Sequence, residues 1–171
     1  LSLSPRATTA IAQWCAREYD DVIDQAHRTL ELDPTCFLAN WVSGVANGMK
    51  GRYREAVRTL EQGRIHAQGD PMTEGALGWA YALAGETERA RDLLRDLTQR
   101  RAEAYVPATC ISWVHVGLGE HDEAIGWANK ACEERDGMCA YFNVTPLHDP
   151  LRRKPRYQTL LRRMKFSAAK P

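Results

Sequence analysis

Apolar residues recur every three or four positions through most of the chain, which is the spacing of one buried helix face. Residues 76–84 show the spacing clearly, with apolar side chains at Ala76, Leu77, Ala80, Tyr81 and Ala84. Proline stands near the start of several such segments, where it can begin a helix but cannot continue one. The pattern predicts paired helices over residues 5–16 and 19–32, 37–50 and 53–66, 71–84 and 87–101, and 105–118 and 121–135.

The predicted pairs repeat with a period of 34 residues. Gly51, Gly85 and Gly119 keep this step, and each opens a similar phrase that ends in alanine. Glycine at this point ends the first helix of a pair, since it tolerates the left-handed backbone conformation. Arg17 stands one period earlier. Two further columns of mostly small residues predict close helix crossings: Ala10, Gly44, Gly78 and Ser112 in one, and Val22, Ala56, Ala90 and Ala124 in the other.

The last 35 residues break the period. Residues 139–146 indicate a connector, and Pro155 begins a further predicted helix with one apolar stripe. A helix that buries one face and exposes the other suits the end of a stacked array. We therefore expect the stripe to pack on the last pair, beside Trp127 and Phe142. The stripe consists of Tyr157, Leu160, Leu161 and Met164.

Composition and charge narrow the functional classes. The chain has 171 residues, of which 44% are hydrophobic and 26% charged, which argues against intrinsic disorder. No apolar run approaches the roughly 20 residues of a spanning helix, so we expect no membrane partner. The net charge of +1 creates no global field for nucleic acid. Five cysteines without CxxC spacing fit reduced thiols, so we expect a cytoplasmic location.

The repeat resembles the tetratricopeptide repeat (TPR) family. Unit two shows the match best, with Gly44, Gly51, Tyr53 and Ala56 at the family's small, glycine, aromatic and alanine positions. Units one and four depart from the pattern, at Gln13, Arg17, Ser112, His115 and His121. The resemblance implies an all-α, right-handed superhelical solenoid. Its four units would span residues 3–36, 37–70, 71–104 and 105–136, followed by a connector and a basic capping helix over 137–171.

The ending of the chain carries a second resemblance. Asp149-Pro-Leu-Arg, followed by Pro155-Arg-Tyr and Leu160-Leu-Arg-Arg, is similar to the tails of bacterial TPR arrays attached to nucleotide cyclases, winged-helix transcription factors and protein kinases. The first residues hold neither an initiator methionine nor the apolar core of a signal peptide. We therefore expect the regulatory module of a larger bacterial protein, acting as a scaffold for protein–protein interaction.

The resemblance also assigns a concave face to fixed positions of each first helix. Four of the five tryptophans fall at these positions, with almost no charge among them. Large aromatic side chains are enriched where a partner packs. We expect Trp41, Trp79 and Trp113 to line one groove for an apolar or helical protein segment, including a segment of the chain itself. The expected groove residues are Ile11, Trp14, Leu38, Trp41, Val45, Met49, Met72, Trp79, Leu83, Val106, Trp113 and Val116.

Two other functions stay open. A small apolar effector is an alternative occupant of the groove, and nucleic acid is a less favoured partner for the basic tail. That tail holds Arg152, Arg153, Lys154, Arg156, Arg162, Arg163, Lys165 and Lys170 against one acid, Asp149. The polar face of a capping helix explains the same charges. Phosphate-loop, nucleophile-elbow and zinc-protease motifs are missing, so we expect no catalytic, cofactor or metal site and no enzyme activity.

Overall fold

The computed structural model describes residues 5–165, with side chains from Thr9 onward. Residues 1–4 and 166–171 lie outside the described residues, and with them the start of the first expected unit and Lys170 of the basic tail. Within the described range the chain forms nine α-helices and two 3-10 helices and no strand. The expected all-α class is confirmed for this part of the chain.

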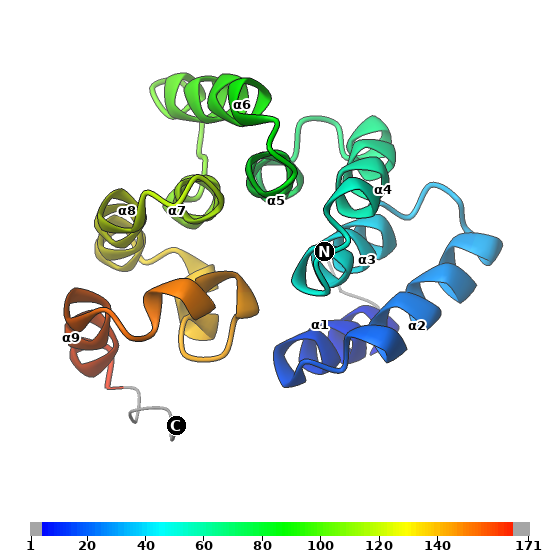
Figure 1. Cartoon of the computed structure of the whole chain (residues 1–171), viewed down its shortest axis with the longest axis horizontal. Helices are drawn as coiled ribbons and strands as arrows, with labels where there is room; N and C mark the ends of the chain where they lie inside the picture. The colour runs from blue at the N-terminus through cyan, green and yellow to red at the C-terminus, as the bar shows by residue number, and fades with distance from the viewer. Residues whose placement is uncertain (1–4, 166–171) are drawn as a thin grey trace.

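Eight of the helices form four hairpin-like pairs arranged along an arc (Figure 1). The first helix of each pair lies on the inner side of the arc and the second on the outer side. Their bounds agree with the sequence prediction within two residues, except that α7 begins three residues late because Pro107 keeps an extended conformation. The pairs are α1 (Pro5–Ala16) and α2 (Tyr19–Leu32), α3 (Phe37–Met49) and α4 (Tyr53–His66), α5 (Pro71–Leu83) and α6 (Thr87–Arg100), and α7 (Ala108–Gly117) and α8 (His121–Glu133).

The turn inside every pair contains one left-handed residue. The φ angles are 68° at Arg17, 75° at Gly51, 84° at Gly85 and 75° at Gly119. A Cβ atom added to any of these three glycines would meet nothing within 4 Å. Glycine is therefore needed there for its backbone conformation and not for space. Arg17 adopts the same conformation and donates a hydrogen bond from its guanidinium to the carbonyl oxygen of Cys15.

The small residues lie at close crossings, as the sequence predicted. A Cβ atom on Gly44 would come within 2.5 Å of Leu60 Cγ in the partner helix, and one on Gly78 within 2.8 Å of Val114 in the next pair. Ser112 donates a hydrogen bond to the carbonyl oxygen of Ala124 across the last pair. Because these contacts leave no room for larger side chains, they fix both the pairing and the stacking.

The inner and outer helices differ in how much of their surface is buried. In α3 the ten residues 39–48 are all buried, and so are the nine residues 73–81 of α5. The outer helix α6 buries one stripe, formed by Ala90, Leu93 and Leu97. A helix buried on all sides must be covered on both faces. The outer helices cover one side of the inner layer, and another element is required on the concave side.

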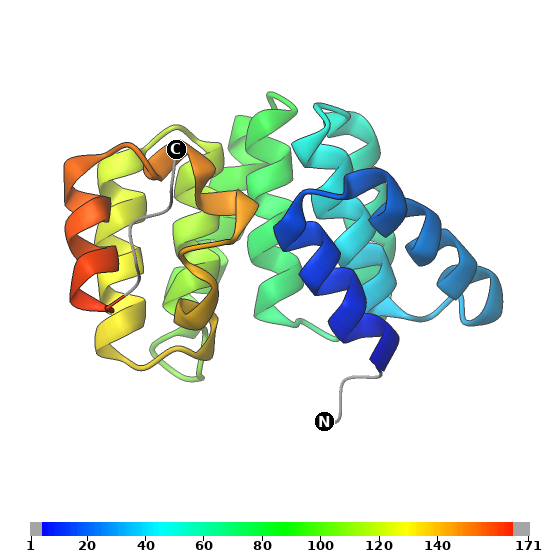
Figure 2. The ribbon, with the colours of Figure 1, turned by 90° about the horizontal axis from the view of Figure 1, so that it is seen from below.

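The segment after α8 supplies that element over α7. It forms the 3-10 helices η1 (Gly137–Tyr141) and η2 (Pro146–Leu151), followed by α9 (Pro155–Arg163). The sequence predicted a connector here and did not predict the two 3-10 helices. Figures 1 and 2 show residues 137–151, coloured yellow to orange, on the inner side of the arc between α9 and α1. Residues 137–151 are called the covering segment below.

The helix α9 packs on α8 and ends the array. Tyr157, Leu160 and Leu161 of the predicted stripe are buried, and Met164 is half-buried with its sulfur 3.2 Å from Cys132 Sγ. The ring centroid of Phe142 lies 6.4 Å from that of Tyr157. The expected burial of the stripe is confirmed. None of the helices within residues 5–165 has the length and apolar character needed to cross a membrane.

We expect Gly85→Ala to lower the free energy of unfolding by about 1 kcal/mol, because an L-residue is strained in the left-handed region. Gly126 provides the matched control. It lies inside α8, and a Cβ atom there would also meet nothing within 4 Å. Gly126→Ala should therefore raise the free energy of unfolding by roughly 0.5–1 kcal/mol. Urea denaturation measures both, and two changes of the same sign would contradict this account of the turn.

Candidate binding site on the inner face

The four tryptophans of the inner helices are buried. Trp14, Trp41, Trp79 and Trp113 are each 2% exposed or less. The ring centroids of Trp14 and Trp41 lie 5.5 Å apart in an edge-to-face arrangement, and those of Trp41 and Trp113 lie 6.1 Å apart. The expectation of an open groove along Trp41, Trp79 and Trp113 is therefore corrected. The rings pack on one another and on neighbouring helices instead of facing solvent.

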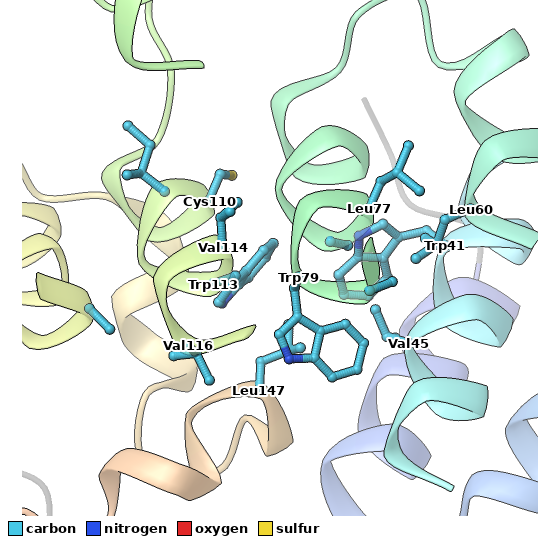
Figure 3. Close-up of a cluster of buried hydrophobic side chains, with 14 of the residues drawn as sticks. Trp41, Val45, Leu60, Leu77, Trp79, Cys110, Trp113, Val114, Val116 and Leu147 are labelled. Carbon is cyan, nitrogen blue, oxygen red and sulfur yellow. The ribbon is translucent and has the colours of Figure 1, made fainter. Parts of the chain in front are cut away.

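Trp79 and Trp113 stand one period of 34 residues apart, yet their rings have different neighbours. The ring of Trp79 fits against Gly48 of α3, where a Cβ atom would overlap it. Trp113 pairs with Trp41 across the array. Figure 3 shows the two side chains pointing in different directions from neighbouring helices. Equal repeat positions therefore did not give equal surroundings, since the Trp79 ring fills the space that Gly48 leaves open and the Trp113 ring packs against Trp41.

The covering segment accounts for much of this burial. Leu147 and Leu151 of η2 are fully buried in the same apolar core as the tryptophans. Figure 3 shows Leu147 reaching from η2 toward Trp79 and Val116. The concave side of α7 is thus occupied by a segment of the chain itself.

Buried polar contacts hold the covering segment in place. His148 Nδ1 lies 2.8 Å from the Tyr157 hydroxyl, which donates a hydrogen bond to the carbonyl oxygen of Phe142. His148 Nε2 lies 3.3 Å from Ser112 Oγ of α7, but the Ser112 hydroxyl already donates to Ala124, so a neutral imidazole that donates from Nδ1 to Tyr157 makes no hydrogen bond there. Burial lowers the pKa of His148 to about 3, and the charge of Arg152 adds to the shift. The imidazole is therefore neutral in the folded protein at neutral pH.

Two arginines tie the covering segment to itself and to the first pair. Arg152 donates hydrogen bonds to the carbonyl oxygens of Asn143 and Thr145 and to the carboxylate of Asp149. Arg17, at the turn between α1 and α2, forms an ion pair of 2.7 Å with the same carboxylate. The start and the end of the array are thus joined through Asp149.

A pocket remains beside the covering segment, between α1, α3, the start of α5 and η1. Its volume is about 350 Å³. Five of the twelve expected groove residues meet there: Ile11, Trp14, Leu38, Trp41 and Met72. The other lining residues, which sequence reasoning missed, are Phe37, Asp70, Met138 and Tyr141. We call this the Trp14–Trp41 pocket.

The seven remaining groove candidates lie outside this pocket. Val45, Val106 and Val116 are buried in the core with Trp79 and Trp113. Met49 and Leu83 are half-buried and pack against the same core. The expected groove is thus reduced to a pocket at the end of the array where α1 and α3 lie.

The lining of the Trp14–Trp41 pocket is rich in aromatic side chains. Trp14 and Trp41 are almost fully buried, and Trp41 Nε1 donates a hydrogen bond of 3.2 Å to the carbonyl oxygen of Met72, which orients the indole. Phe37 and Tyr141 are each 41% exposed and are its more accessible aromatic residues. Ligand pockets commonly combine such apolar walls with a small number of polar groups.

Asp70 is the charged residue of the lining, and it also caps α5. Its Oδ2 accepts hydrogen bonds from the backbone N–H of Thr73 at 2.8 Å and from the Thr73 hydroxyl at 2.9 Å. This cap fixes the carboxylate at the rim of the pocket, because the first turn of the helix holds it.

Other clusters of titratable side chains are weaker candidates for a functional site. His115 Nδ1 lies 2.7 Å from Glu120, which also pairs with Arg91, so this histidine belongs to a network of ion pairs. Within the part of the chain that the structure describes, no three His, Cys, Asp or Glu side chains gather as they would around a metal ion. The Trp14–Trp41 pocket is therefore the candidate binding site.

Comparisons with protein-family models, curated proteins and solved structures find no match to this chain. Its fold and its pocket are therefore interpreted from its own residues.

We expect the stability of the protein to fall when the pH is lowered from about 6.5 to 5. The unfolded chain takes up a proton on His148 near pH 6.5, whereas the folded state resists it down to about pH 3. The unfolded state binds more protons in this window, so the free energy of unfolding falls by up to about 1.4 kcal/mol per pH unit. The contribution of His148 to the free energy of unfolding is complete above pH 6.5 and is lost as the pH falls.

Urea unfolding at several pH values measures this slope, and His148→Gln is the matched variant. The window between pH 5 and 6.5 lies above the range where carboxyl groups ordinarily titrate. The variant should lose most of the slope there, whatever its stability at pH 7. Equal slopes in the two proteins would show that His148 does not carry the effect.

Proposed function

We propose that this chain is the ligand-binding module of a larger regulatory protein, and that it holds a compact apolar group in the Trp14–Trp41 pocket. The observation that carries the proposal is the pocket itself. Its volume of about 350 Å³ lies within the range of small-molecule sites, and its walls are almost entirely apolar. The small apolar effector, one of the two groove occupants considered from the sequence, is the better fit.

The size of the pocket favours a compact group over a helical segment. A helix with its side chains is roughly 10 Å across and needs a continuous groove. The tryptophans that were expected to line such a groove are buried, and Leu147 and Leu151 occupy the face beside α7. A protein partner would reach this pocket with one anchoring side chain, or would have to displace the covering segment.

The architecture supports the wider proposal. Four helix pairs with a left-handed residue every 34 residues are what a TPR array would have, and we propose a right-handed TPR-like solenoid. Such a scaffold binds and is not itself catalytic, so the proposal includes no enzyme activity. Its setting would be the bacterial cytoplasm, as one domain of a larger protein.

The basic residues near the end favour a capping role for α9 over nucleic-acid contact. Arg156 forms an ion pair of 2.8 Å with Asp122 of α8, and Arg163 donates a hydrogen bond to Asn129 of the same helix. Arg152 is engaged within the covering segment. Cations that already have partners in the protein are less available to phosphate groups.

Ligand binding in this pocket would join the two ends of the array. The lining comes from α1 and α3 at one end and from Met138 and Tyr141 of η1 at the other. A ligand that touches both favours the closed arrangement by its binding free energy, since it binds the folded, closed state alone. This is how a binding event would be passed to a domain attached to the chain.

The test uses 2-phenylethanol, a neutral aromatic probe, in isothermal titration calorimetry. We expect saturable binding, and we expect Leu38→Trp to weaken it by at least about tenfold, because the larger side chain fills the pocket. Leu94→Trp is the matched control, since Leu94 is also half-buried but lies on α6, outside the pocket. Absence of saturable binding, or unchanged affinity in a folded Leu38→Trp variant, would overturn the proposal.

A further inference from the structure

We infer that the Trp14–Trp41 pocket selects a cation: a compact apolar amine, whose aromatic or branched alkyl body packs against the rings while its positive nitrogen lies beside Asp70. This inference rests on the proposed function, because the same pocket must hold the apolar body. It adds the charge and the chemical class of the ligand.

The charge of the lining is unbalanced. Asp70 is the charged member of a lining that is otherwise apolar or aromatic. Thr73 occupies Oδ2, and among the described residues Oδ1 has no hydrogen-bond donor and no ion-pair partner. A carboxylate beside apolar walls loses part of its hydration, and a cationic group restores the lost interaction.

The nearby arginines are engaged by other partners. Arg64 and Arg100 lie near the start of α5 and both form ion pairs with Glu74. Arg100 also donates a hydrogen bond of 2.7 Å to the carbonyl oxygen of Gly69, the residue before Asp70. The chain therefore directs its local cations to the buried Glu74 and leaves the carboxylate at the pocket without one.

The rings that line the pocket also favour a cation. Trp14 and Trp41 are each 2% exposed and pack edge to face with their planes at 69°, so they offer little accessible ring surface. Phe37 and Tyr141 are each 41% exposed and supply the accessible aromatic rings of the lining. The faces of aromatic rings are electron-rich and attract cations within about 6 Å, and aromatic cages hold quaternary ammonium groups in this way. Met72 and Met138 adapt their flexible side chains to the remaining space.

The same features disfavour the other ligand classes. A carboxylate or a phosphate would meet the charge of Asp70 and find no positive side chain among the lining residues. A neutral hydrocarbon would bind the walls but leave Oδ1 without a partner. A large amphiphile exceeds a volume of about 350 Å³. An apolar amine satisfies the walls and the carboxylate together.

The experiment compares three probes of nearly equal shape by calorimetry at neutral pH: phenethylamine, which is protonated, 2-phenylethanol, which is neutral, and phenylacetate, which is negative. We expect phenethylamine to bind at least about tenfold more tightly than 2-phenylethanol, and phenylacetate to bind most weakly. Asp70→Asn should abolish this preference, so that phenethylamine and 2-phenylethanol bind the variant with similar affinity. Asparagine caps a helix as well as aspartate, so the variant keeps the cap of α5.

Asp33→Asn is the matched control. Asp33 is exposed, bonds to Thr35, and is not part of the pocket, so this variant should keep the preference for the amine. If Asp70→Asn does not fold, the native protein is titrated at increasing salt concentrations. An affinity for phenethylamine that falls with added salt, together with an affinity for 2-phenylethanol that does not fall, supports the inference.

The outcomes separate this inference from the proposed function. Equal binding of the three probes, a preference that survives in Asp70→Asn, or salt-independent binding of the amine would overturn the choice of a cation and leave the apolar pocket standing. Failure of all three probes to bind would overturn both.

Discussion

The structure depends on covering the concave side of the inner helices. Stacking gives α3 and α5 inner helices on either side and gives α7 one on a single side, with outer helices behind them, but a repeat array leaves the concave side bare. With Trp79 and Trp113 on these helices, that side is too apolar to face water. Leu147 and Leu151 of the covering segment lie over it and are fully buried. Burying a leucine side chain contributes about 1.5–3 kcal/mol, which makes this contact a part of the core.

A covering segment of 3-10 turns brings backbone groups into the core that it cannot satisfy internally, because these turns are short and their hydrogen bonds few. Arg152 binds the carbonyl oxygens of Asn143 and Thr145, and Tyr157 binds that of Phe142. His148 completes the network as a neutral, fully buried side chain. The polar contacts that fix the position of the segment also make its attachment sensitive to acid, since protonation would leave a charge in the core.

The pocket lies where this cover stops. The segment crosses the array from α9 toward α1, and Met138 and Tyr141 close one side of the space in front of Trp14 and Trp41. The site therefore exists because a repeating part and a non-repeating part meet. Asp70 caps α5 and also lines this pocket, so a residue with a structural role supplies the charge of the site.

The sequence by itself determined the helix pairs, because a 34-residue period with helical apolar spacing has one simple structural solution. It also predicted the buried stripe of α9. The sequence placed Arg17 at the glycine position of unit one as a departure from the repeat, and only the structure showed that Arg17 is left-handed there. It placed the tryptophans on the inner helices but could not show whether they were exposed, since periodicity describes one face and not what lies against it. Only the tertiary structure decided that residues 137–151 return over the array. Short turns around Pro146 and Pro150 have no periodicity that would place them, and so Phe37, Asp70, Met138 and Tyr141 joined the pocket through contacts distant in sequence.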